Sequence, residues 1–168
     1  MKRLIPFLFA TALCTGALAE TIEGKVVAVS DGDTITVLDR DHRQIKIRLS
    51  GIDAPEKKQA FGQRSKQNLS RLVFNKEVRV EWHKRDKYKR TIGKVWVQPT
   101  DCHECATTLD ANLAQLNAGM AWWYRQYAKE QPVEEQNRYS QAEAEAQTQR
   151  IGLWADPSPM PPWEWRHR

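Results

Sequence analysis

The chain has 168 residues and a formal charge of +5, with 28% charged residues and a mean hydropathy of −0.69. Because domains commonly hold about 100–200 residues, this length predicts a single domain. No stretch beyond residues 1–19 has the ~20 consecutive apolar residues that a membrane span needs, which excludes a multi-span membrane protein. The modest positive charge permits a polyanionic partner without requiring one.

Residues 1–19 are predicted to be a secretory signal peptide that is cleaved before Glu20. Lys2 and Arg3 form a basic start, an apolar stretch follows, and residues 17–19 end the segment in an A-x-A pattern. These are the three parts of an export signal. Its removal would take away two positive charges and lower the formal charge from +5 to +3. We therefore expect an exported protein, periplasmic or secreted, without a membrane anchor.

Two alternatives for this leader are a membrane anchor and a lipid attachment site. The apolar stretch is interrupted by Pro6 and Gly16, and it falls short of the ~20 residues of a span. Cys14 is preceded by Leu13, which is too large for the residue before a lipidated cysteine. Both features favour a cleaved signal peptide.

The first half of the remaining chain predicts five short strands and one helix. Apolar and polar residues alternate in the strand segments, most clearly in residues 43–52. The predicted strands cover residues 21–30, 33–39, 43–52, 77–82 and 91–98. After Pro55 the apolar spacing becomes that of an amphipathic helix. Its apolar face holds Phe61, Leu69, Leu72 and Val73.

The second half predicts two more helices. Thr108 is placed to cap the first of them, which carries an apolar stripe and is expected to end at Gly119. The stripe consists of Leu109, Leu113 and Leu116. Residues 133–150 predict a polar, Ala-rich helix. Its expected buried residues are Val133, Tyr139, Ala142 and Ala146.

The order of these elements predicts the fold class. Five short strands, with a helix after the third and helices at the end, are the order of an OB-type barrel. We therefore expect an α+β fold with a mainly β core, a five-stranded OB-fold barrel with three helices. The domain is expected to cover residues 20–155. The sequence GLW at residues 152–154 is expected to end the last helix and to anchor it to the domain. Residues 156–168 form a tail rich in Pro and Trp, which is ordered only if its tryptophans dock.

Cys102 and Cys105 lie in the sequence DCHEC and are the two cysteines outside the leader. In an exported protein such a close pair predicts a disulfide. The alternative is half of a zinc site, but no second C-x-x-C is present to complete four ligands. A thioredoxin-like redox motif should open a helix, whereas this pair is expected in a loop.

Four acids lie at two predicted turns. Asp31 and Asp33 stand between the first two strands, and Asp53 and Glu56 follow the third. If both turns lie at one end of a small barrel, their carboxylates converge and repel one another unless a cation neutralises them. Such oxygen ligands suit Ca²⁺ or Mg²⁺. The alternative is ordinary turn chemistry, because D-G-D-T also suits a tight turn.

Two arginines favour a functional site over simple turns. Arg48 lies five residues before Asp53, and Arg90 is the last residue of the basic segment HKRDKYKR. Each arginine either pairs with the acids or donates two parallel hydrogen bonds to a substrate phosphate. Arginines, a divalent cation and a spare Glu56 are the parts that phosphodiester hydrolysis requires.

The segments VVAVSDGDTITV, IRLSGIDAPE, FGQRSKQNLSRLV and RDKYKR…GKVWV together resemble the thermonuclease (staphylococcal nuclease-like) family. The similarity runs from about Ile22 to Trp154. It implies an OB barrel with three helices and Ca²⁺-dependent cleavage of DNA and RNA. It also implies cleavage at the 5′ oxygen, which leaves 3′-phosphate ends.

The resemblance also implies roles for individual residues. The metal ligands would be Asp33, Asp53 and the backbone oxygen of Ala54, with Asp31 acting mainly through water. The catalytic residues would be Arg48 and Arg90, which bind phosphate, and Glu56, the proposed general base. Substrate would also contact Lys87, Tyr88 and Tyr127.

The chain departs from the family pattern in three places. Lys89 stands where the family has Gly, so a positive φ there would strain the loop that carries Arg90. The second base-stacking residue beside Tyr127 is open among Trp123, Tyr124 and Arg125. The DCHEC segment is an addition to the pattern.

Three functions remain as alternatives. The first is an exported Ca²⁺-dependent endonuclease that acts as a monomer on DNA and RNA. The second is a catalytically weak OB-fold module that only binds nucleic acid, and the third is a structural Ca²⁺-binding protein. The chain keeps the acids and arginines that degenerate members lose, which favours the enzyme. The third alternative leaves Arg48, Arg90 and Glu56 without a use.

Overall fold

The computed structural model describes residues 20–99, 102 and 105–168. The predicted signal peptide lies outside the described residues. Within them, no helix is long and apolar enough to cross a membrane. Cys102 and Cys105 form a disulfide, with their Cα atoms 5.5 Å apart.

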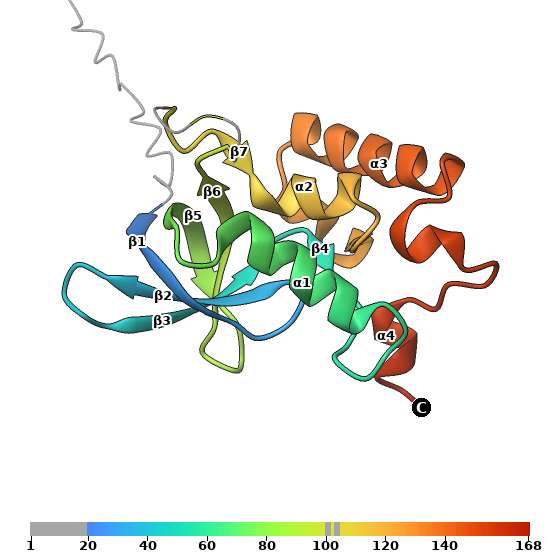
Figure 1. Cartoon of the computed structure of the whole chain (residues 1–168), viewed down its shortest axis with the longest axis horizontal. Coiled ribbons are helices and arrows are strands. Elements are labelled where there is room, and N and C mark those ends of the chain that lie inside the picture. The colour runs from blue at the N-terminus through green and yellow to red at the C-terminus, as the bar shows by residue number, and fades with distance from the viewer. Residues whose placement is uncertain (1–19, 100–101, 103–104) are drawn as a thin grey trace, which may run out of the picture.

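Five strands form a closed barrel, with helices gathered toward one side of it (Figure 1). The barrel strands are β1 (Glu20–Val29), β2 (Thr34–Asp39), β3 (Gln44–Leu49), β5 (Glu77–Arg85) and β6 (Thr91–Val97). Neighbouring strands pair antiparallel in the order β3-β2-β1-β5-β6, and parallel pairing of β3 with β6 closes the barrel. The predicted five-stranded OB-fold barrel is confirmed.

The barrel forms because each strand turns one face inward. Along β6 the burial alternates strictly between buried and half-buried residues, as the period of two requires. The barrel interior is filled by β-branched residues and leucine that are at most 2% exposed. They include Val26, Ile35, Val37, Ile47, Leu49, Val78, Val80, Val95 and Val97.

Three longer helices pack as a layer on the barrel. They are α1 (Gly62–Val73), α2 (Ala111–Asn117) and α3 (Val133–Thr148). α2 contacts both of the other two helices and also strand β6. The remaining short elements are β4 (Ile52–Asp53), β7 (Leu109–Asp110), β8 (Trp122–Trp123), η1 (Arg125–Glu130), η2 (Gly152–Ala155) and α4 (Pro162–Trp165).

The start of α2 differs from the prediction. Leu109 and Asp110 pair with β6 as strand β7, so the helix begins at Ala111. Asp110 is the N-cap, and its side chain accepts a hydrogen bond from the backbone N–H of Leu113 at 3.0 Å. Thr108 was therefore the wrong cap, because sheet pairing extends two residues past it. The predicted end is confirmed, since Gly119 adopts φ +62° just after the helix.

α3 buries a different set of side chains from the predicted one. Val133 is 68% exposed, whereas Glu135 and Glu143 are buried. The helix accommodates these acids because each has a partner: Glu135 pairs with Lys94, and Glu143 accepts from the backbone N–H of Trp123 at 3.0 Å. Apolar periodicity cannot reveal such residues. The predicted burial of Tyr139, Ala142 and Ala146 is confirmed.

The C-terminal tail docks on the domain. It runs past the loop before α1 and ends in the short helix α4 (Figure 1). Gln59 in that loop donates to the backbone oxygen of Met160 at 2.6 Å. Trp163 stacks on Tyr124 with the ring centroids 5.7 Å apart and the planes 8° from parallel. Residues 156–168 therefore belong to the folded unit.

The corrected N-cap of α2 can be tested by two substitutions. Asp110→Ala should lower the free energy of unfolding by about 1–2 kcal/mol, because the cap hydrogen bond is lost. Thr108→Ala, at an exposed position two residues before it, should change stability by less than about 0.5 kcal/mol. Urea unfolding followed by circular dichroism measures both. Equal effects of the two substitutions would contradict the assignment.

Candidate active site

One cleft of ≈ 1040 Å³ contains every residue predicted for the active site. The turn after β1 and the segment after β3 form one wall, and the basic loop between β5 and β6 forms another. The predicted residues in it are Asp31, Asp33, Arg48, Asp53, Ala54, Glu56, Lys87, Tyr88, Arg90 and Tyr127. The structure thus brings together groups that are spread over 97 positions of the chain, from residue 31 to residue 127 inclusive.

Strand register explains why Arg48 meets the first acidic turn. Arg48 on β3 is paired directly with Thr34 on β2, and Asp33 immediately precedes Thr34. The backbone N–H of Leu49 donates to the carbonyl of Asp33 at 2.8 Å, which extends the pairing by one residue. A shift of one residue would turn Arg48 into the barrel interior.

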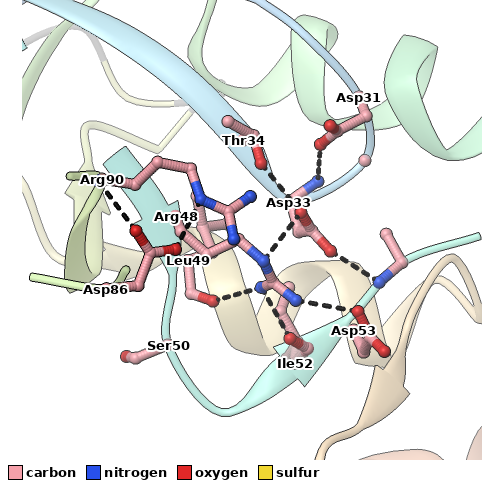
Figure 2. A network of polar contacts seen from close by, with 12 residues as sticks. Asp31, Asp33, Thr34, Arg48, Leu49, Ser50, Ile52, Asp53, Asp86 and Arg90 are labelled. Carbon is pink, nitrogen blue, oxygen red and sulfur yellow. Dashed lines mark hydrogen bonds and ion pairs between the residues drawn. The ribbon is translucent and has the colours of Figure 1, made fainter. Parts of the chain in front are cut away.

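The parallel pairing of β3 with β6 brings the second arginine to the same place. Arg48 is in register with Ile92, and Ile47 with Thr91. Arg90 directly precedes Thr91 and therefore lies next to the part of β3 that carries Arg48. Figure 2 shows Arg90 and Asp86 on one side of Arg48 and the acidic turns on the other.

Arg48 ties the two acidic turns together. Its Nε lies 3.2 Å from Oδ1 of Asp33, and its Nη2 lies 2.8 Å from Oδ1 of Asp53. Its Nη1 donates to the carbonyls of Leu49 and Ile52 at 2.7 and 2.8 Å. Among the described residues, these partners take four of its five N–H hydrogens, which leaves one hydrogen on Nη2. The structure therefore shows Arg48 as an ion-pair partner of the acids, and its binding of a substrate phosphate stays a prediction.

The carboxylates are held close together by the backbone. Oδ2 of Asp33 accepts from the backbone N–H of Ala54 at 2.7 Å, which joins the first turn to the second. Asp31 accepts from the backbone N–H of Asp33 at 3.1 Å. Burial, followed by the charge of Asp33, raises the pKa of Asp31 to about 6. Burial also raises the pKa of Asp53, against the opposing effect of the arginines beside it.

A buried amide fixes the turn between Asp31 and Asp33. Nε2 of Gln115 on α2 donates to the carbonyl of Gly32 at 2.6 Å, and Gln115 is fully buried. A side chain on Gly32 would collide with Ser65 of α1, because an added Cβ would lie 1.8 Å from its Oγ. The helical layer therefore positions these two acids, which cannot relax apart in spite of their repulsion.

The loop that carries Arg90 is organised by Asp86. Its carboxylate accepts from the backbone N–H groups of Tyr88 and Arg90, both at 2.9 Å, and from Nε of Arg90 at 2.7 Å. Lys89 adopts φ +63°. The loop therefore accepts the left-handed conformation at Lys89 instead of reshaping. Within the described residues, the two terminal nitrogens of Arg90 make no hydrogen bond and are free for a substrate.

The donor set fits a hard divalent cation. Asp33, Asp53 and nearby carbonyl oxygens are the kind of ligand that Ca²⁺ prefers. The charge of Asp33 adds to the effect of burial in raising the pKa of Asp31. In the part of the chain that is described, no three His, Cys, Asp or Glu side chains gather closely enough to hold a metal by themselves. A bound cation would therefore need carbonyl and water ligands in addition.

Two residues of the cleft were not assigned from the sequence. Tyr124 lines the cleft and meets Tyr127 edge to face at 5.0 Å, whereas Arg125 pairs with Glu143 on α3. Of the three alternatives, Tyr124 is the one that lines the cleft, and its stacking on a base stays a prediction. Arg166 of the tail also lines the cleft. No local pattern pointed to it, although the tail tryptophans indicated a segment that could dock.

Residues 46–156 match the family described as staphylococcal nuclease homologue. The chain belongs to the staphylococcal nuclease family. An uncharacterized endonuclease of Haemophilus influenzae is 44% identical over 86% of this chain and 72% of its own length. A micrococcal nuclease of Shigella flexneri is 44% identical over 85% of this chain and 79% of its own. An uncharacterized endonuclease of Escherichia coli is 39% identical over the whole chain and 99% of its own length.

Membership of the staphylococcal nuclease family confirms the resemblance drawn from the sequence motifs. The matched region contains Arg48, Asp53, Glu56 and Arg90, whereas Asp31 and Asp33 lie before it. The roles of these residues remain predictions for this member of the family.

Arg48→Lys should destabilise the protein as well as its site. A lysine cannot reach two carboxylates and two carbonyls at once, and buried acceptors left without donors cost about 1–3 kcal/mol. We expect a loss of about 2 kcal/mol in the free energy of unfolding. Arg90→Lys, at a more exposed position, should lose less than about 1 kcal/mol. Urea unfolding of the two variants checks this, and equal losses would show that Arg48 does not tie the turns.

Lys89→Gly should stabilise the protein. The left-handed conformation costs a non-glycine residue roughly 1–2 kcal/mol, against about 0.5–1 kcal/mol for the greater freedom of glycine when unfolded. We expect a gain of about 0.5–1 kcal/mol in thermal or urea unfolding. Lys87→Gly is the matched control, because Lys87 lies outside the left-handed region. It should lose about 0.5 kcal/mol, and a gain in both variants would contradict the account.

Proposed function

We propose that this protein is an exported, Ca²⁺-dependent endonuclease that hydrolyses phosphodiester bonds of DNA and RNA and leaves 3′-phosphate ends. The observation that carries the proposal is the convergence of Arg48, Arg90, Glu56, Asp33 and Asp53 on one cleft. The names of the relatives from Haemophilus influenzae and Shigella flexneri support nuclease activity. The predicted signal peptide supports export to the periplasm or medium, and a monomer is the expected state.

The arginines would bind the scissile phosphate. Arg90 offers its free terminal nitrogens, and Arg48 offers the remaining hydrogen of Nη2. Guanidinium groups suit this task because their planar N–H groups match two phosphate oxygens at once. Charge that develops on these oxygens during attack is stabilised by donors already in place.

Glu56 would accept a proton from the attacking water. Its side chain is 38% exposed and lies at the mouth of the cleft, so water reaches it. The proton passes to the carboxylate as the water oxygen bonds to phosphorus and the bond from phosphorus to the 5′ oxygen breaks, and the departing 5′ oxygen takes up a proton from solvent to become a hydroxyl. The phosphate then stays on the 3′ oxygen.

Asp33, Asp53 and the Ala54 carbonyl would hold the cation, with Asp31 acting through water. When bound, Ca²⁺ supplies positive charge that polarises the phosphate and orients water. Tyr127 and Tyr124 would stack on a base, and Lys87 and Tyr88 would contact a neighbouring phosphate. Tyr88 is 68% exposed and free to do so.

The alternative function is an OB-fold module that binds nucleic acid with little or no catalysis. One observation favours it: Arg48 is largely occupied by the protein itself, which leaves less of it for a transition state. The complete set of acids and arginines favours the enzyme. Cleavage assays separate the two alternatives.

The test is cleavage of single-stranded DNA, duplex DNA and RNA by the chain from Glu20 to Arg168. We expect activity with Ca²⁺ that chelator abolishes, and a fall of about 100-fold or more in Glu56→Gln. Glu130→Gln is the matched control, since Glu130 lines the same cleft with an equal 38% exposure. It should retain activity.

Two results would contradict the proposal. Near-normal turnover of Glu56→Gln would remove Glu56 as the base. Salt-sensitive binding of nucleic acid without cleavage under any metal would identify the binding module instead.

A further inference from the structure

The C-terminal tail places a third arginine on the acids of the site. Nη2 of Arg166 donates to Oδ2 of Asp53 at 2.8 Å, and its Nη1 lies 3.3 Å from Oδ1 of the same carboxylate. The same Nη1 donates to Oε1 of Glu56 at 2.8 Å. One guanidinium thus bridges the predicted metal ligand and the predicted base, which lie 113 and 110 positions away in sequence.

The tail has anchors of its own, apart from Arg166. Met160 is held through its backbone oxygen by Gln59, and Pro162 is buried. Trp163 stacks on Tyr124 and meets Trp122 edge to face at 5.6 Å. These contacts deliver Arg166 to the cleft, so its position does not depend on its ion pairs alone.

Arg166 uses the oxygen lone pairs that a cation would need. A carboxylate has about four acceptor positions. Asp53 already accepts from Arg48 on Oδ1 and from Arg166 on both oxygens. These three contacts occupy most of the acceptor positions of Asp53, and its side chain is only 1% exposed. A guanidinium on the same oxygens also supplies the positive charge that a cation would bring.

We propose that Arg166 is a functional residue of the site that competes with the divalent cation for Asp53 and also holds the carboxylate of Glu56. The tail acts as an internal latch, which the cation must displace before it binds. The inference rests on the proposed function, because it assumes that Asp53 is a cation ligand. Its consequence is that the cation affinity of the chain is weaker than that of the same acids without the latch.

The size of the effect follows from the population of open molecules. Apparent affinity falls in proportion to the fraction of molecules whose site is free. A latch that is closed in about nine of ten molecules weakens cation binding about tenfold. Arg166 is 39% exposed, so solvent weakens its pairs and the latch remains reversible.

The experiment is calorimetric titration of CaCl₂ into the chain from Glu20 to Arg168 in 0.15 M salt without nucleic acid. Arg166→Gln should bind Ca²⁺ about tenfold more tightly than the unchanged chain. Arg166→Lys keeps the positive charge but cannot contact both carboxylates as a planar guanidinium does. Its affinity for Ca²⁺ should therefore lie between those of the unchanged chain and Arg166→Gln.

Arg168→Gln is the matched control. It removes the same charge from the same tail, and the side chain of Arg168 has no ion pair with any residue that the structure describes. Its affinity should stay within about twofold of the unchanged chain, because an exposed charge that makes no direct pair with the described acids has only a weak, solvent-screened effect on them.

A second variant, Trp163→Ala, tests the latch independently in case Arg166→Gln does not fold. Trp163→Ala keeps Arg166 but removes the aromatic anchor of the tail, so Ca²⁺ should again bind more tightly, by a smaller factor. Thermal melting by circular dichroism shows whether each variant is folded.

The Ca²⁺ affinities of these variants either support or overturn the proposed latch. Equal affinities of Arg166→Gln and Arg168→Gln, or weaker binding by Arg166→Gln, would overturn the latch. If the unchanged chain still cleaves DNA with Ca²⁺ in that case, the proposed function stands and only the latch fails. If neither the unchanged chain nor Arg166→Gln binds Ca²⁺, the latch and the Ca²⁺ dependence fail together.

Discussion

The parallel pairing of β3 with β6 is the constraint on which the rest of the molecule depends. The other strand pairs of the barrel are antiparallel and link strands in a chain, whereas this pair closes the ring. Closure removes the open sheet edges and seals the apolar interior. It also sets Arg90 beside Arg48, so the contact that completes the core also assembles the cleft. Stability and site geometry therefore share one origin in this fold.

The cleft concentrates negative charge that the fold must hold in place. Asp31, Asp33 and Asp53 are drawn together by hydrogen bonds from backbone N–H groups and by Arg48. Burial disfavours the charged forms of Asp31 and Asp53 and raises the pKa of both carboxyl groups. Such an arrangement is typical of a functional site. The free energy lost by burying carboxylates close together is offset by the packing of the surrounding structure.

The barrel and the acid and arginine residues were predictable because they depend on local patterns. The alternation of apolar and polar residues identified the strands. The turn sequences between them contained the acids. The cap at Asp110 was missed because a two-residue strand follows no visible period. Glu135 and Glu143 were missed because a buried acid depends on partners from other elements. Arg166 joins the site across more than a hundred residues, and nothing near it in the sequence indicates this contact.

The docked tail also matters for how the protein is handled. The last residue, Arg168, lies two positions beyond the guanidinium that touches Asp53. An affinity tag fused to this terminus would therefore start at the mouth of the cleft. A polyhistidine tag would add metal-chelating side chains beside the carboxylates. Recombinant material for work on this cleft should carry no tag directly after Arg168, or a tag that is removed without leaving residues behind.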